Sequence, residues 1–156
     1  NVIISTIIGT KTADAFIIAL CNLIQRLAID RLHVLGDIYD RGPGAHLIVD
    51  TLRNFSDWDI TWGNHDMIWI GAASGNPACV ASVLRLSLRY ANTTTLDDGY
   101  SINMVPLATF AMETYGEDAC EVFKPKIETP ANASDPKQLR LVSQMHKAIA
   151  IIQFKL

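Results

Sequence analysis

The chain has 156 residues, of which 49% are hydrophobic, and a formal net charge of −3. This length suits one domain, and the negative charge, without any run of basic residues, argues against a surface for nucleic acid or anionic membrane. The apolar start, residues 1–8, is far shorter than the roughly 20 residues of a membrane-spanning helix, and no signal peptide is visible.

Apolar periodicity predicts an α/β order in the first half of the chain. A helix is expected over residues 12–28, where Phe16, Leu20, Leu23 and Leu27 form a stripe. Short apolar runs predict strands at 32–35 and 58–62, and helical spacing at 46–54 lies between them. Strand, helix, strand is the order of a βαβ crossover in a parallel sheet, with both following loops at the same edge.

The second half is predicted to be mainly helical. Helices are expected over residues 67–73, 78–90, 106–115 and 136–156, with a loop at 92–99. The proline-containing stretch 117–136 is expected to be irregular. We therefore predict a single partial domain over 1–156, with an α/β core piece at 1–75 and a mainly helical extension at 76–156.

The cysteines indicate a reducing compartment. Cys21, Cys79 and Cys120 are widely spaced and form no Cys-x-x-Cys pair. This pattern favours reduced, mostly buried thiols over disulfides or a zinc site. We expect a cytoplasmic protein.

Two motifs follow the predicted strands: GDIYDRG at 36–42 and WGNHD at 62–66. Phosphate ester hydrolysis needs divalent cations that lower the pKa of a water and neutralise charge on the phosphoryl oxygens. Asp37, just after the first strand, can bridge two metals, and the Asn64 amide oxygen can bind the second. The sequence therefore predicts part of a two-metal phosphatase centre at the carboxyl ends of the two strands.

The remaining motif side chains suit substrate binding and proton transfer. Arg41 fits a planar, bidentate grip on a phosphate. His65 can protonate the leaving alkoxide, and either Asp40 or Asp66 can orient its imidazole, of which we favour Asp40.

Each motif residue also has a purely structural interpretation. Asp37, Asn64 and Asp66 could cap helices or form turns, and Arg41 could be a solvated loop charge. We prefer catalysis because the motifs occur together after adjacent strands. Outside them, Arg85 and Arg89, four residues apart, are expected on a solvated face rather than in a second phosphate clamp. The other histidines, His33, His46 and His146, are assigned no role.

The motifs resemble two blocks of the calcineurin-like metallophosphoesterase superfamily. The stretch from Leu27 to Gly75, with TLDDGYSINMVPLATFAMETYG and the tail MHKAIAIIQFKL, is more specifically similar to class III fructose-1,6-bisphosphatases of bacteria. The resemblance implies hydrolysis of the 1-phosphate of a sugar bisphosphate in gluconeogenesis, with manganese as the metal. It implies metal binding by Asp37 and Asn64, phosphate binding by Arg41, and His65 as acid paired with Asp40. Protein Ser/Thr phosphatases and dinucleoside tetraphosphate hydrolases use the same loops and remain alternatives.

Three blocks of the superfamily pattern are missing from the sequence. It contains no Asp-x-His, and no Gly-His or His-x-His follows Asp66. Because the chain starts at Asn1 and ends within an apolar helical pattern, we expect an internal piece of a longer enzyme that self-associates through exposed apolar surface. A non-catalytic packing or interaction module is the alternative for the piece itself.

Overall fold

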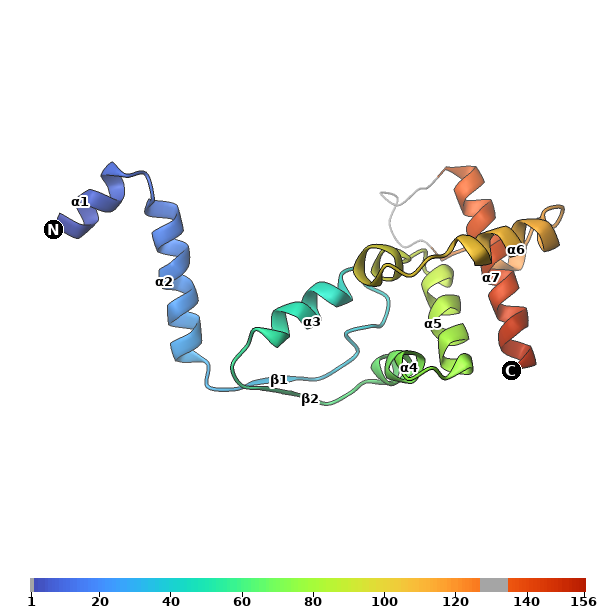
Figure 1. Ribbon diagram of the computed structural model, residues 1–156, viewed down its shortest axis with the longest axis horizontal. Helices are drawn as coiled ribbons and strands as arrows, with labels where there is room; N and C mark the ends of the chain where they lie inside the picture. Colours follow the sequence, from blue (N-terminus) through green and yellow to red (C-terminus); the bar gives the residue numbers. More distant parts are fainter. Residues whose placement is uncertain (1, 127–134) are drawn as a thin grey trace. The chain divides into compact units, whose positions relative to one another are not determined.

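The structure, a computed structural model, describes residues 2–126 and 135–156. Its elements, in chain order, are α1 (Val2–Gly9), α2 (Ala13–Ala28), β1 (Leu32–Val34), α3 (Ala45–Arg53), β2 (Trp58–Ile60), α4 (Asn64–Ala73), α5 (Pro77–Arg89), the π-helical turn η1 (Thr95–Gly99), α6 (Val105–Tyr115), the 3-10 turn η2 (Glu121–Phe123) and α7 (Pro136–Lys155) (Figure 1). The protein is thus mixed α/β and mostly helical, with a small parallel sheet.

The sheet has two strands in the described part of the chain, and they pair in parallel. Leu32 lies opposite Trp58 and His33 opposite Asp59. Nδ1 of His33 lies 2.7 Å from Oδ1 of Asp59 across this pairing. Because α3 separates β1 from β2 in the chain, the predicted strand, helix, strand order is confirmed.

The chain folds as two compact units. The first comprises residues 1–34 and 55–60 and contains α1, α2 and the sheet. None of the described residues of α1 or α2 is buried. The second comprises residues 35–54 and 61–156 and contains both motif loops and all remaining helices. The expected division of the chain near residue 75 stays a prediction.

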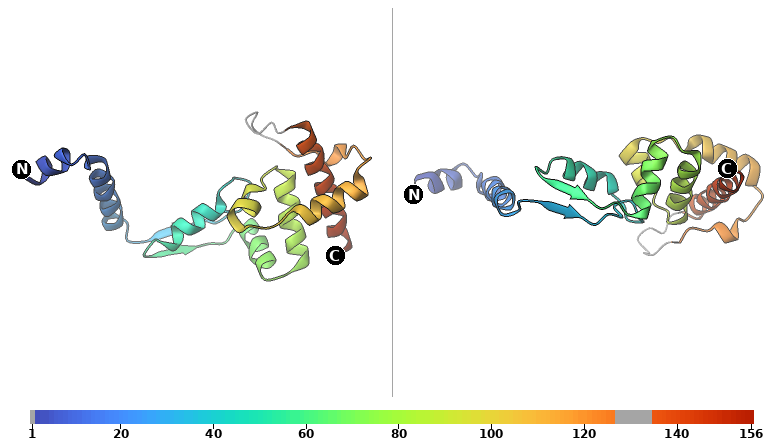
Figure 2. Two further views of the ribbon diagram at one scale, coloured as in Figure 1. Left: turned by 45° about the horizontal axis from the view of Figure 1, so that its top comes forward. Right: turned by 90° about the horizontal axis from the view of Figure 1, so that it is seen from below.

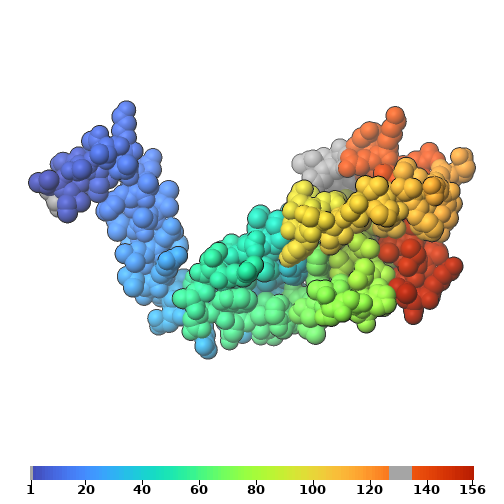
Figure 3. Space-filling view, in the orientation of Figure 1, coloured from blue at the N-terminus to red at the C-terminus, as the bar shows by residue number. Residues whose placement is uncertain are grey.

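The core of the second unit lies where α5, α6 and α7 pack together (Figure 2), and the outer surfaces of α6 and α7 lie side by side in Figure 3. Small side chains at the centre let the helices approach closely. The buried cluster consists of Ala81, Leu88, Ala111, Met145, Ala148 and Ile149. Polar contacts add direction to this packing, because Gln144 Nε2 donates to the Tyr115 carbonyl at 3.0 Å and Gln153 Nε2 to Ser82 Oγ at 2.8 Å.

Local sequence explains where the two long helices of this unit begin. Asn76 accepts a hydrogen bond from the Cys79 amide at 3.1 Å, and Asp135 accepts one from the Lys137 amide at 3.1 Å. Each cap is followed by a proline at the first helical position, where its missing N–H costs nothing.

Several boundaries differ from the predictions. Helix α4 begins at Asn64 instead of residue 67, so two motif residues lie in its first turn. Part of the expected loop at 92–99 forms η1. In the expected irregular stretch 117–136, residues 127–134 lie outside the described part, and η2 interrupts the remainder. Of the cysteines, Cys120 is buried as expected, whereas Cys21 is exposed. None of the helices in the described ranges is long and apolar enough to cross a membrane.

Candidate active site

The two motif loops meet at the buried carboxylate of Asp66, which is 1% exposed. Its Oδ2 accepts hydrogen bonds from the Asp37 amide at 2.6 Å and the Gly63 amide at 2.9 Å, and its Oδ1 accepts one from the Tyr39 amide at 3.2 Å. Asp66 is also the third residue of α4, where a carboxylate satisfies free helix N–H groups. One side chain therefore caps α4 and ties the first loop to the second.

Glycine is needed where the loops touch. A Cβ atom on Gly36 would collide with the Thr61 carbonyl and the Gly63 amide, and one on Gly63 would collide with the Asp37 carboxylate. Gly36 also has a φ of 87° and Asp37 a φ of 52°, both in the left-handed region. The Gly-Asp and Gly-Asn pairs of the motifs thus have a steric cause that is independent of any ligand.

Asp37 and Asn64, the expected metal ligands, lie on these neighbouring segments. Oδ1 of Asp37 accepts a hydrogen bond from the His65 amide at 3.2 Å, and both Asp37 and Asn64 are exposed. A carboxylate and an amide oxygen are donor types that suit Mg²⁺ or Mn²⁺. Among the described residues, however, no group of three or more His, Cys, Asp or Glu side chains could hold a metal ion. The side chains of Asp37 and Asn64 are thus of the type that binds divalent metals, but they supply only part of a ligand set.

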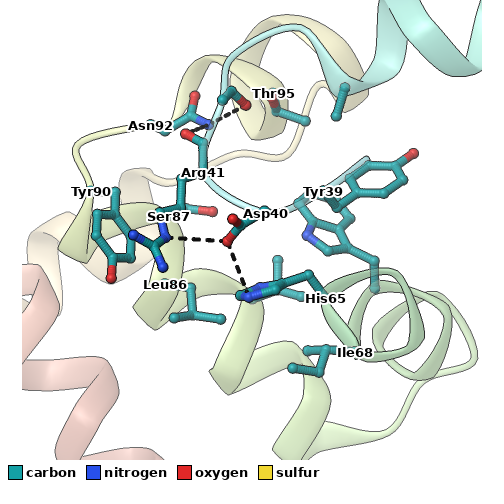
Figure 4. Close-up of a pocket in the computed structure, with 14 residues that line it drawn as sticks. Tyr39, Asp40, Arg41, His65, Ile68, Leu86, Ser87, Tyr90, Asn92 and Thr95 are labelled. Carbon is teal, nitrogen blue, oxygen red and sulfur yellow. Dashed lines mark hydrogen bonds and ion pairs between the residues drawn. The ribbon is translucent and has the colours of Figure 1, made fainter. Parts of the chain in front are cut away.

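Asp40 lies between the expected acid and the expected phosphate ligand (Figure 4). Its Oδ1 is 3.1 Å from Nε2 of His65 and 3.3 Å from Nε of Arg41. The His65 side chain is 20% exposed, against 54% for that of Arg41. The structure thus brings the three residues together around one carboxylate oxygen, while Asp66, the other candidate partner of His65, is engaged with backbone amides.

Two residues that the sequence did not single out also contact Arg41. The guanidinium carbon lies 5.0 Å from the ring centroid of Tyr90, in a cation–π arrangement. Asn92 Nδ2 donates to the carbonyl of Arg41 at 3.0 Å and to that of Gly42 at 2.9 Å. Some fifty residues separate these contacts in the chain, so no local motif spacing could have revealed them.

A small pocket opens beside these side chains, between the first motif loop, α4 and the end of α5. Its wall includes Arg41, His65, Trp69, Ser87, Tyr90 and Thr95 (Figure 4). Tyr39 also lines the pocket: its ring packs 4.6 Å from that of Trp69, and its hydroxyl hydrogen bonds to that of Tyr100. Burial and this hydrogen bond raise the pKa of Tyr39 well above its ordinary value, so its hydroxyl stays protonated.

The other histidines, and the arginines of α5, do not contact Asp40, Arg41 or His65 through any bond among the described residues. His33 is on β1, His46 contacts the ring of Tyr100, and His146 is buried with Nδ1 2.9 Å from the Phe123 carbonyl. Arg85 and Arg89 do not line the pocket. Their Nε atoms are buried, without a hydrogen-bond partner among the described residues, so the expected fully solvated face is wrong for them.

Comparisons with known proteins identify the relatives of this sequence. A family model described as "Firmicute fructose-1,6-bisphosphatase" matches residues 1–156. Three curated relatives are named class 3 fructose-1,6-bisphosphatase. The protein of Bacteroides thetaiotaomicron is 65% identical over 156 residues, that of Phocaeicola vulgatus 62% over 156, and that of Clostridium botulinum 59% over 157.

The match covers the whole of this chain but a small part of each relative. The chain spans 24% of the Bacteroides protein and 23% of the other two. No solved structure matches it.

Proposed function

The chain belongs to the fructose-1,6-bisphosphatase family whose model it matches, and from this we propose that it is the segment of such an enzyme that carries its phosphate-binding and proton-donating residues. The full-length enzyme would hydrolyse the 1-phosphate of fructose 1,6-bisphosphate, a step of gluconeogenesis, in the cytoplasm. The observation that supports this most directly is the position of Asp40 Oδ1 between His65 and Arg41.

Arg41 is suited to hold the substrate phosphate. Its Nε lies 3.3 Å from Oδ1 of Asp40, and the described residues form no hydrogen bond to Nη1 or Nη2. These two nitrogens can therefore offer the paired N–H groups that match two phosphate oxygens.

His65 is suited to donate the proton that a sugar alkoxide needs on leaving. Because Oδ1 of Asp40 lies 3.1 Å from Nε2, the other ring nitrogen, Nδ1, is the one that can deliver a proton to the substrate. Asp40 orients the ring.

Asp37 and Asn64 would bind the divalent metal, which we take from the family to be manganese. Metal bound there would lower the pKa of a water and withdraw charge from the phosphoryl oxygens. We propose that the other metal ligands lie outside these 156 residues, in the rest of a metallophosphoesterase fold. The relatives are about four times as long as this chain.

The proposal is tested by assaying the purified full-length enzyme, with Mn²⁺, on fructose 1,6-bisphosphate, a phosphoserine protein and a dinucleoside tetraphosphate. We expect the sugar bisphosphate to be hydrolysed with by far the highest kcat/KM. Asp37→Asn, which replaces a carboxylate that would bind metal by a neutral amide, should lower Mn²⁺ affinity and activity together. A preference for either other substrate would assign the enzyme to that class. No activity on any of the three would favour a packing or interaction module.

A further inference from the structure

Arg41 is exposed and lies on a loop, so its guanidinium needs outside support to stay in one position. A free arginine side chain has many rotamers, and their loss opposes a fixed position. Asp40 alone is a weak restraint, because the same oxygen also serves His65. The chain nevertheless supplies two more contacts, both from the end of α5 and the turn after it.

Tyr90 supports the side chain of Arg41. Its ring lies 5.0 Å from the guanidinium carbon and lines the same pocket (Figure 4). Within the described part of the chain, the guanidinium is therefore held by the Asp40 carboxylate at Nε and by the Tyr90 ring, and Nη1 and Nη2 have no hydrogen-bond partner there. A flat aromatic surface restrains a planar cation without using any of its N–H groups.

Asn92 supports the backbone of the same loop. Both of its amide hydrogens are used, one on the carbonyl of Arg41 at 3.0 Å and one on that of Gly42 at 2.9 Å. Its Oδ1 accepts from Thr94 Oγ1 at 3.2 Å, which fixes which end of the amide faces the loop. The backbone N–H of Asn92 in turn donates to the Ser87 carbonyl at 2.8 Å, which ties the turn after α5 to that helix.

We propose that Tyr90 and Asn92 are positioning residues, which hold Arg41 in the orientation that binds the substrate phosphate. This rests on the proposed function, because it takes Arg41 as the phosphate ligand. Through them, α5 becomes part of the phosphate site without touching the reacting atoms.

The test uses inorganic phosphate as a probe of the site in the full-length enzyme. We expect Tyr90→Leu to raise the inhibition constant of phosphate and the KM for fructose 1,6-bisphosphate by roughly 2- to 30-fold, the range of a cation–π contact, with a smaller effect on kcat. Tyr90→Phe keeps the ring and should restore both values toward those of the unmodified enzyme. Asn92→Asp has nearly the same shape but places an acceptor against two carbonyls, so it should weaken phosphate binding as well.

A double-mutant cycle separates positioning from general stability. In an Arg41→Gln background, Tyr90→Leu should have no further effect on phosphate inhibition, because the group that it positions is gone. An equal loss in both backgrounds, or wild-type inhibition constants in both Tyr90→Leu and Asn92→Asp, would overturn the inference. The proposed function fails separately, if the unmodified enzyme does not hydrolyse the sugar bisphosphate or Arg41→Gln binds phosphate normally.

Discussion

At the scale of single residues, Asp40 lies between Arg41 and His65, the two basic side chains for which we propose different tasks. Its Oδ1 contacts Nε of Arg41 and Nε2 of His65, which are not the atoms that we expect to act on substrate. The carboxylate therefore orients both groups while their reactive edges stay free. Because His65 is the less exposed of the two, its ring has fewer alternative positions than the guanidinium.

The role of His65 as an acid predicts a dependence on the leaving group. In the full-length enzyme, His65→Asn should lower turnover of fructose 1,6-bisphosphate by roughly 10²- to 10⁴-fold, because the sugar alkoxide leaves poorly without a proton. A nitrophenyl phosphate should be affected much less, since its leaving group departs unprotonated. Asp40→Asn should show the same selectivity more mildly. Equal losses on both esters, measured as kcat, would make His65 a phosphate or metal contact instead.

The buried carboxylate of Asp66 predicts a structural cost for a very small change. In Asp66→Asn, the new NH₂ group must face at least one of the three backbone N–H donors, and an unsatisfied buried donor costs about 1–3 kcal/mol. We expect the free energy of unfolding to fall by about that amount, with faster hydrogen exchange at the Asp37 and Tyr39 amides. Asp98→Asn, at an exposed carboxylate, is the matched control and should change neither.

The sequence predicts which motif residues are neighbours, but not all of the contacts that they make. Asp40, Arg41 and His65 could be grouped because their loops follow adjacent parallel strands. Asp66 was considered as a helix cap, which it is, but its bonds to Asp37 and Tyr39 depend on the left-handed turn at Gly36 and Asp37. The contacts of Tyr90 and Asn92 depend on how α5 packs, which no pattern within the motifs encodes.

At the scale of elements, the helices were predictable and their ends were less so. Apolar spacing predicts α2, α5 and α7. For α5 and α7 the spacing reflects burial, because their apolar stripes meet in one core. Helix α4 starts earlier than its apolar residues suggest, because the cap is a glycine with a carboxylate three residues later. The π-helical turn η1 lacked any such signal in an apparently polar loop.

The packing of α7 against η2 predicts a pH dependence of stability. His146 is 6% exposed, and burial, together with the charges of Arg85 and Arg89, lowers its pKa below the ordinary 6.5 despite its hydrogen bond to Phe123. As the pH falls below 6.5, His146 takes up a proton in the unfolded chain before it does so in the folded chain. The free energy of unfolding therefore decreases.

His146→Gln should remove this part of the pH dependence. We expect the urea midpoint of the unmodified protein to fall more between pH 7.5 and pH 5.5 than that of the variant. Gln is chosen because its amide can still donate to the Phe123 carbonyl. Identical pH profiles for the two proteins would show that the imidazole is not held neutral by its surroundings.

At the scale of the whole chain, some apolar helix faces pack in the core while others remain exposed. The stripe predicted on α2 forms, but Phe16 is 42%, Leu23 50% and Leu27 75% exposed. At the other end, Phe154 is 84% exposed although α7 is part of the core. Exposed apolar side chains that gather on one helix, as they do on α2, often mark a protein contact.

These faces predict that the 156-residue chain self-associates. The weight-average mass in light scattering should rise with concentration, because association removes apolar area from water. Leu23→Gln with Leu27→Gln should shift the curve toward monomer, whereas changes to exposed polar residues such as Asp14→Asn should not. A monodisperse monomer at high concentration would contradict the prediction.

The last prediction concerns metal binding by the same 156 residues. A manganese ion takes about six oxygen or nitrogen ligands, and this chain offers the Asp37 carboxylate and the Asn64 amide without a cluster of three acidic, histidine or cysteine side chains in its described part. Two such donors leave most of the coordination to water, so binding should be weak. We expect a Mn²⁺ titration followed by electron paramagnetic resonance to show at most one loosely bound ion, which Asp37→Asn should release. Turnover of fructose 1,6-bisphosphate should stay near background, since neither charge neutralisation nor water activation is then available. Tight binding of two ions, or turnover close to that of the full-length enzyme, would mean that these residues complete the metal centre by themselves.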